Sequence, residues 1–302
     1  MNDTANPPIE RDAAAERTAL IGIIAILAIG LGLAWAGSQG SIFTFGLPLF
    51  ALCGAFAFAV QWIVFVPSFV ARTEHYFDLT GSITYISTVL GTAVLAGSNP
   101  RSWLIAALVA IWALRLGTFL FIRVRQDGKD GRFDAIKQSF VRFLMAWTLQ
   151  GLWVFLTLAA ALAAMTSAQQ APLGLLAWLG VALWAAGFAI EAVADAQKRA
   201  FKQRTDRDKD FITDGLWAWS RHPNYFGEIL LWFGVALIAA EVLSGWQWVT
   251  MISPIFVYVL LTRISGVPLL ESRGKKRWGG DPEYQAYRER VPVLFPKPPR
   301  TA

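Results

Sequence analysis

The sequence predicts an all-α integral membrane protein with about eight transmembrane helices, and two observations carry that fold class. Of its 302 residues, 55% are hydrophobic and 16% are charged, whereas an ordinary soluble domain has roughly 25% charged residues. Uncharged runs long enough to cross a bilayer also recur along the chain, since a helix needs about 20 apolar residues to do so. A water-soluble globule is therefore excluded.

Eight segments meet the expectation for a membrane span. Six are uncharged over their whole length, Ser102–Ile122 is interrupted only by Arg115, and Pro223–Ala240 is shorter than the rest. The six uncharged runs are Thr18–Gly37, Ser41–Ala71, Leu79–Asn99, Phe143–Ala171, Pro172–Ile190 and Val242–Thr262.

The distribution of basic residues predicts the orientation of these spans. With a cytoplasmic N-terminus, the cytoplasmic segments would be 1–17, 72–77, 123–142, 191–222 and 263–302. They hold 25 of the 27 Lys and Arg residues, and only Arg101 and Arg115 fall elsewhere. This is the excess expected of cytoplasmic loops, so both termini are expected in the cytoplasm. Contact of these loops with anionic lipids accounts for most of the net charge of +6 without nucleic acid.

The chain is expected to divide by function rather than at a linker. We expect a cytoplasmic, frayed tail over residues 1–17, membrane helices on the substrate side over 18–190, and a C-terminal region over 191–302. In the last region, short spans alternate with long charged segments that contain aromatic residues. The chemistry is therefore expected to face the cytoplasm from this region.

The stretch SRHPNYFGE, residues 220–228, concentrates polar side chains just before an apolar run. Pro223 fits the first turn of a helix, where its missing N–H costs little. Backbone N–H groups at such a start favour an anion, and phosphate is the obvious candidate. The polar side chains gathered here are Arg221, His222, Asn224, Tyr225 and Glu228.

Two further cytoplasmic segments have a similar character. The chain from residue 191 is expected to continue the preceding span as a helix, with Glu191, Asp195, Lys198 and Lys202 on one face. That face is either a solvated exit turn or the lining of a pocket. The segment after Arg263 combines a basic run with tyrosines. All three segments are expected to close over one ligand.

Polar residues inside the membrane are candidates for function because they are costly there. Arg115 is expected to need a partner, and Asp78 is the nearest plausible one. Asp78 and Tyr85 share a helical face, although Asp78 is also compatible with a helix N-cap. No metal site is expected, since the chain has two histidines and lacks the common metal and nucleotide motifs.

Three segments in this order, EAVADAQKRAFK, DGLWAWSRHPNYFGE and SGVPLLE, resemble the bacterial branch of the steroid 5-alpha reductase clan. The resemblance covers about residues 190–296. It implies a helical membrane protein whose cytoplasmic C-terminal loops bind NADPH and whose substrate is a lipophilic small molecule that enters from the lipid. A bacterial inner-membrane location follows from the same resemblance.

Residues are carried over from the resemblance position by position. The implied cofactor-binding residues are Arg115, Glu191, Asp195, Arg199, Lys202, Arg221, Asn224, Tyr225, Glu228 and Arg263.

The implied catalytic residues polarise an enone carbonyl so that hydride can add to the double bond. Asp78 stands where the clan has a glutamate, and Trp112 stands where it has a tyrosine. An indole donates a hydrogen bond but is a far weaker acid than a phenol. Either Tyr85 takes the place of that tyrosine or the reaction differs.

Two other functions remain open at this point. RHPNY, followed by Glu271, Tyr284 and Tyr287, is similar to the isoprenylcysteine methyltransferases, which use S-adenosylmethionine. A transporter or scaffold that retains the fold is the non-catalytic alternative. An NADPH-dependent reductase of an activated C=C bond is the expected function.

Overall fold

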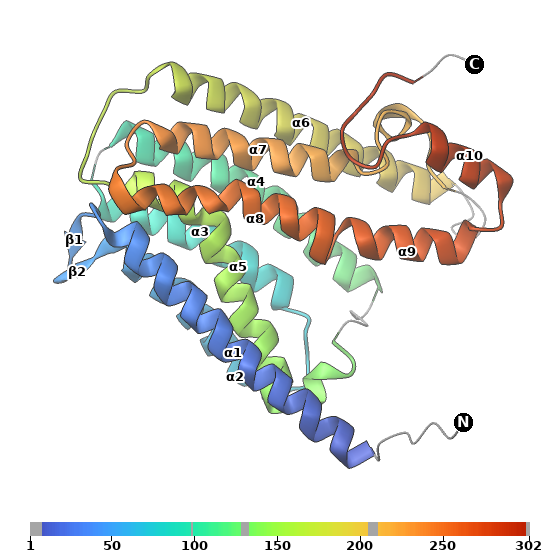
Figure 1. The fold of residues 1–302 in the computed structure, drawn as a ribbon, viewed down its shortest axis with the longest axis horizontal. Coiled ribbons are helices and arrows are strands. Elements are labelled where there is room, and N and C mark those ends of the chain that lie inside the picture. Colours follow the sequence, from blue (N-terminus) through green and yellow to red (C-terminus); the bar gives the residue numbers. More distant parts are fainter. Residues whose placement is uncertain (1–7, 98, 128–132, 205–210, 300–302) are drawn as a thin grey trace. The chain divides into compact units, whose positions relative to one another are not determined.

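The computed structural model describes residues 8–97, 99–127, 133–204 and 211–299. These residues form two compact units. The first contains residues 1–172 and 242–251, and the second contains 173–241 and 252–302. Helices dominate both units (Figure 1), which confirms the predicted all-α class.

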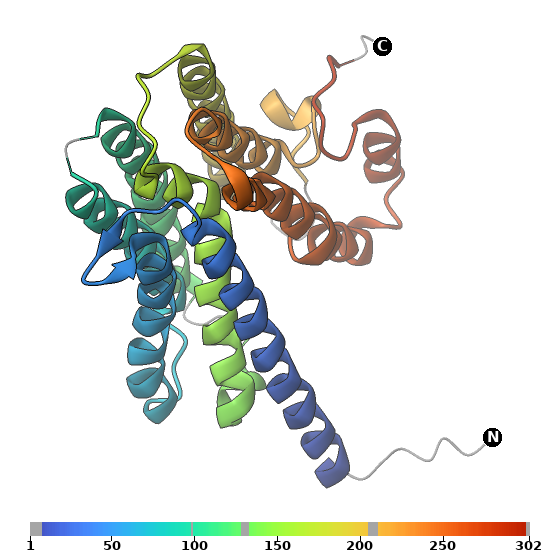
Figure 2. The same cartoon turned by 60° about the vertical axis from the view of Figure 1, so that its left-hand side comes forward.

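The first unit is a bundle of long helices. α1 and α5 lie side by side in both views (Figures 1 and 2), and α3 packs on α2, α4 and α5. Its elements are α1 (Pro8–Ser38), β1 (Phe43–Thr44), β2 (Leu47–Pro48), α2 (Leu49–Val70), α3 (Phe77–Leu95), α4 (Pro100–Asp127), the 3-10 helix η1 (Ile136–Gln138), α5 (Phe140–Thr166) and the 3-10 helix η3 (Gly245–Met251).

Two expectations for the N-terminal part were wrong in their bounds. The frayed tail expected over residues 1–17 is helical from Pro8, where α1 begins, and residues 1–7 lie outside the described part of the chain. The run Ser41–Ala71 is not one helix, because strands β1 and β2 pair antiparallel in a hairpin before α2 starts. Left-handed backbone at Phe45 and Gly46, with φ of 55° and 76°, makes the tight turn between these strands.

Polar contacts hold α3 in the first unit. Gln61 Nε2 on α2 donates a hydrogen bond of 2.8 Å to Thr84 Oγ1, and Gln150 Nε2 on α5 donates one of 2.9 Å to Phe77 O. Such interhelical hydrogen bonds stabilise helix packing in lipid by about 1 kcal/mol each. They explain why a helix rich in threonine is stable in an apolar bundle.

The second unit is built on the pair α6 (Leu175–Arg204) and α7 (Pro223–Ala240), which run side by side in both views (Figures 1 and 2). Glycines allow the close approach. A Cβ atom on Gly187 would lie 2.5 Å from the carbonyl oxygen of Gly227, and one on Gly180 would lie 2.5 Å from that of Gly234. Small residues let membrane helices pack backbone to backbone in this way.

The remaining elements of the second unit include two short stretches that are not α-helical, a 3-10 helix and a π-helix. The 3-10 helix η2 (Gly215–Ala218) precedes α7, and α8 (Ile252–Val259) passes through the π-helix η4 (Leu260–Ile264) into α9 (Val267–Trp278) and α10 (Pro282–Arg290). The run Val242–Thr262, expected as one span, is therefore 3-10 helix, α-helix and π-helix in succession. α7 begins at Pro223 as expected.

Within the described residues, seven helical stretches are long and apolar enough to cross a membrane. One expected span, Leu79–Asn99, has no counterpart among the seven. Most of it lies in α3, which does not meet the hydropathy criterion. Its buried threonines, at positions 80, 84, 88 and 92, lower its hydropathy. The chain is an all-α integral membrane protein of about eight helices.

Candidate functional site

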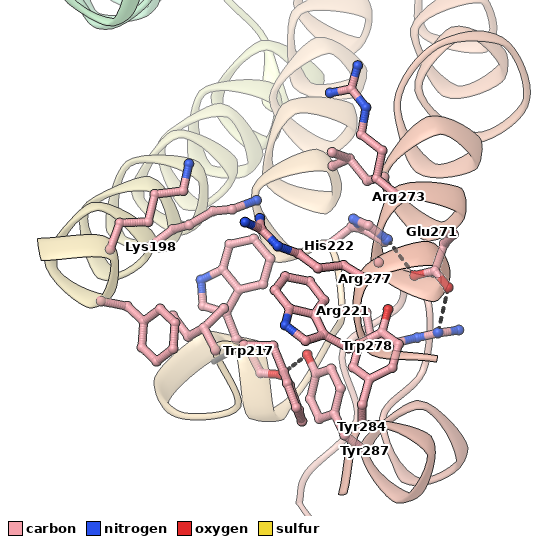
Figure 3. A pocket seen from close by; sticks show the side chains of 16 residues that line it. Lys198, Trp217, Arg221, His222, Glu271, Arg273, Arg277, Trp278, Tyr284 and Tyr287 are labelled. Carbon is pink, nitrogen blue, oxygen red and sulfur yellow. Dashed lines mark hydrogen bonds and ion pairs between the residues drawn. The ribbon is translucent and has the colours of Figure 1, made fainter. Parts of the chain in front are cut away.

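The second unit contains a cavity of about 480 Å³ at the ends of its helices. This volume falls within the ordinary range for small-molecule sites, roughly 300–1,000 Å³. The C-terminal part of α6, the segment before α7, α9 and α10 all contribute side chains (Figure 3). The lining residues are Lys198, Phe201, Lys202, Phe211, Ile212, Trp217, Arg221, His222, Leu270, Glu271, Arg273, Gly274, Arg277, Trp278, Tyr284 and Tyr287.

Helical spacing brings the basic residues of this cavity together. Lys198 and Lys202 are four residues apart on α6, and Arg273 and Arg277 are four apart on α9. Residues at this spacing lie on the same face of a helix. Arg221 adds a fifth cation from the segment before α7. The wall is therefore strongly positive.

Glu271 is the carboxylate among the lining residues, and three basic side chains surround it. Its Oε2 lies 2.7 Å from Arg221 Nη1 and 3.4 Å from Arg288 Nη2. Its Oε1 lies 3.0 Å from His222 Nε2. Burial lowers the pKa of His222 below its usual value, although the hydrogen bond to Glu271 acts in the opposite direction. A neutral His222 therefore donates from Nε2 to the carboxylate.

Aromatic side chains form much of the remaining wall. The Phe211 ring packs on Tyr284 at 4.9 Å and on Trp278 at 5.9 Å between centroids. Lys198 Nζ lies 4.7 Å from the centroid of Trp217, within the range of a cation–π contact. Tyr287 donates a hydrogen bond of 2.9 Å to Trp217 O. Burial raises the pKa of this tyrosine, so its hydroxyl stays protonated.

The C-terminal segment holds the SRHPNYFGE motif in place. Arg221 N donates to Pro292 O at 2.9 Å, and Lys297 N donates to Trp219 O at 3.0 Å. Ser220 Oγ donates to Leu294 O at 2.8 Å. These bonds satisfy backbone groups that the preceding loop leaves without a helical or sheet partner. The motif thus presents Arg221 and His222 to the cavity.

The residues expected to bind the cofactor fall into two groups. Lys202 and Arg221 line the cavity. The others lie outside its lining, and among them Asn224 Nδ2 donates to Asp195 Oδ1 at 3.3 Å, which links α7 to α6. Tyr225 stacks on His222 with 5.7 Å between ring centroids.

Four more of these expected residues lie nearby in the second unit, three of them on α6 or α7 and one in η4. Glu191 is buried where α6 meets Gly227, and Glu228 is half-buried on α7. Arg199 on α6 and Arg263 in η4 are exposed. The structure therefore places these four residues beside the cavity-forming helices without making them part of its wall.

The four residues expected to act inside the membrane lie in the first unit. Tyr85 and Trp112 are buried, and their rings meet edge to face at 5.2 Å and 88°. Asp78 is the second residue of α3, and the N-cap position is Tyr76. The interpretation of Asp78 as a helix cap was therefore wrong. Arg115 is half-buried on α4.

Several wall residues were not among the expected site residues. Trp217, Arg273, Arg277 and Trp278 were outside that set, although the sequence had indicated that three basic, aromatic-bearing segments would meet. The useful signal was the i, i+4 spacing of cations on α6 and α9. The aromatic residues gave no such signal, because they come from segments that lie apart in the sequence.

The fold and this cavity define a class: an α-helical membrane protein with a basic, aromatic-lined pocket in its second unit. Residues 64–291 match the family described as Protein of unknown function (DUF1295), and the chain belongs to that family. Among curated proteins, the Uncharacterized protein C594.04c of Schizosaccharomyces pombe is 23% identical over 231 residues. The alignment covers 66% of this chain and spans 64% of that relative's length. No solved structure matches the chain.

Proposed function

We propose that this protein is a membrane-embedded, NADPH-dependent reductase that acts on an activated C=C bond of a lipophilic substrate. The observation that carries the proposal is the cavity of the second unit, in which five cationic side chains and six aromatic ones form one wall. Phosphates are recognised by Arg and Lys, and a purine packs well on aromatic rings. The donor set therefore fits a phosphorylated dinucleotide.

The charge of the wall favours this ligand over S-adenosylmethionine. Glu271 is already surrounded by Arg221, His222 and Arg288, so the carboxylate is largely neutralised. A sulfonium cation would then meet a wall of uncompensated positive charge, and like charges at close range repel by several kcal/mol at an effective dielectric constant of about 20. NADPH, with its three phosphate groups, has the complementary charge.

One observation favours the methyltransferase as a second candidate. Arg221, His222, Glu271, Tyr284 and Tyr287 carry the similarity to isoprenylcysteine methyltransferases, and all five line the same cavity. Ligand binding therefore has to separate the two functions.

The residues proposed to act on the substrate carbonyl belong to the first unit. When bound, NADPH would supply a hydride to the β-carbon of the alkene, and a proton from solvent would complete the saturated product. A donor network of Asp78 with Tyr85 or Trp112 would stabilise negative charge on the carbonyl oxygen. The contact between Tyr85 and Trp112 supports Tyr85 as the phenol that replaces the missing tyrosine.

The first test is a thermal unfolding scan of the detergent-purified protein with NADPH, NADH and S-adenosylmethionine in parallel. A ligand that binds only the folded state stabilises it by about 2.7 kcal/mol at a hundredfold excess over its Kd. We expect NADPH to raise the Tm of the wild type and not that of Asn224→Ala, which loses the hydrogen bond to Asp195. A rise with S-adenosylmethionine alone would indicate methyl transfer. No rise with any of the three would favour a transporter or scaffold.

The proposal also includes a bacterial inner membrane location with both termini in the cytoplasm. Gln169 and Gln285 are both exposed, and the predicted topology puts them on opposite sides. In a Cys53→Ala background, Gln169→Cys should react with a membrane-impermeant maleimide in intact cells. Gln285→Cys should react only after lysis. The reverse pattern would overturn the orientation.

A further inference from the structure

Glu271 connects three elements of the second unit through one carboxylate. It lies on α9 and contacts Arg221 and His222 from the segment before α7 and Arg288 from α10. Figure 3 shows the contacts of this side chain with Arg221 and His222 as dashed lines. Both carboxylate oxygens are engaged, with Arg221 and Arg288 at Oε2 and His222 at Oε1.

The side chain of Arg221 depends on this carboxylate for its position. The backbone of Arg221 is held by Pro292, but its guanidinium extends to Glu271 Oε2 at 2.7 Å. A charge-assisted hydrogen bond of this length is among the stronger contacts in proteins. Without Glu271, the guanidinium groups of Arg221 and Arg288 would repel one another, and the neutral imidazole of His222 would lose its acceptor.

We propose that Glu271 is a positioning residue for the nucleotide: it holds Arg221 and His222 in the cavity wall at the point where a phosphate is to be received. The inference rests on the proposed function. Glu271 acts through Arg221 and His222, because its own negative charge repels an anionic ligand.

If Glu271 has this role, removing its charge changes the affinity for NADPH in the direction opposite to the one that electrostatics alone predicts. Removing a negative charge from a cavity that binds an anion should strengthen binding by Coulomb attraction alone. If Glu271 positions the cations, Glu271→Gln should instead weaken NADPH binding by at least about tenfold, the lower end of what a charge-assisted hydrogen bond is worth. The direction of the change therefore tests the inference.

The experiment is a measurement of the Kd of NADPH by calorimetry for the wild type, Glu271→Gln and Glu289→Gln. Glu289 is exposed on α10 and outside the cavity lining, so its variant controls for the loss of one negative charge. Glu271→Asp, which keeps the charge, should recover part of the affinity. We expect the weakest binding for Glu271→Gln and wild-type affinity for Glu289→Gln, with each Kd measured at a temperature where the Tm without ligand shows the variant to be folded.

A second variant covers the case in which Glu271→Gln does not fold. The double variant Glu271→Gln/Arg288→Gln restores the balance of charge around position 271 and should fold, but it should still bind NADPH at least about tenfold more weakly, because Arg221 lacks its carboxylate. Equal or tighter binding by either folded variant would overturn the role of Glu271 and leave the reductase proposal standing. Failure of the wild type to bind NADPH would overturn both.

Discussion

Adding a methyl group to Gly180 and to Gly187 in one variant is expected to destabilise the second unit strongly. Each Cβ atom would lie 2.5 Å from a carbonyl oxygen of α7, and a backbone atom cannot move aside as the end of a side chain can. Overpacking of this kind costs about 1–3 kcal/mol per site. We therefore expect Gly180→Ala/Gly187→Ala to lower the Tm strongly in a thermal unfolding scan.

The matched control is the same substitution at Gly32 in α1. A Cβ atom there would meet nothing within 4 Å, and alanine is a better helix former than glycine by about 0.5–1 kcal/mol. Gly32→Ala should therefore leave the Tm unchanged or raise it. A double variant of α6 as stable as Gly32→Ala would show that α6 and α7 are not in backbone contact.

Reversing the charges of Arg273 and Arg277 is expected to reduce NADPH affinity by at least about 100-fold, since each charge-assisted contact is worth about 1.5–3 kcal/mol. Both side chains line the cavity from α9, where they would face the ligand's phosphates. The measurement is the Kd of NADPH for Arg273→Glu/Arg277→Glu, made over a series of salt concentrations.

The same helix offers a control with an identical change in net charge. Lys275 and Lys276 are exposed and do not line the cavity. Lys275→Glu/Lys276→Glu should change the NADPH affinity by less than about threefold at 0.15 M salt, because water and salt screen exposed charges that make no contact with the ligand. Equal losses in the two double variants would mean that net charge alone, rather than this wall, attracts the ligand.

Much of the fold could be predicted because the bilayer imposes simple rules. Length and hydropathy were sufficient to find most of the spans, and Pro223 predicted the start of α7. They did not predict the hairpin at Phe43–Pro48, nor the 3-10 and π-helical turns within Val242–Thr262. The residues that form the hairpin, the 3-10 helix and the π-helix are as apolar as those of an α-helix. Hydropathy therefore does not distinguish these backbone geometries.

The candidate site was only partly predictable. The i, i+4 spacing of Lys198 and Lys202 shows that they share a face, but spacing within one helix says nothing about what the face meets. Trp217 and Tyr287 illustrate the difference, since a hydrogen bond joins them across 70 residues of sequence. Likewise, the sequence around Glu271 did not indicate that Arg221, His222 and Arg288 would contact it.

The sequence by itself determined the membrane character and the all-α class, and it predicts an orientation that the labelling experiment tests. Each follows from properties that add up along the chain, namely apolar length and the number of basic residues in each loop. Only the tertiary structure decided which cations share a cavity with which aromatic rings, and which three basic groups meet at Glu271. Those contacts depend on how α9 and α10 dock on the segment before α7, and docking is set by packing between distant residues.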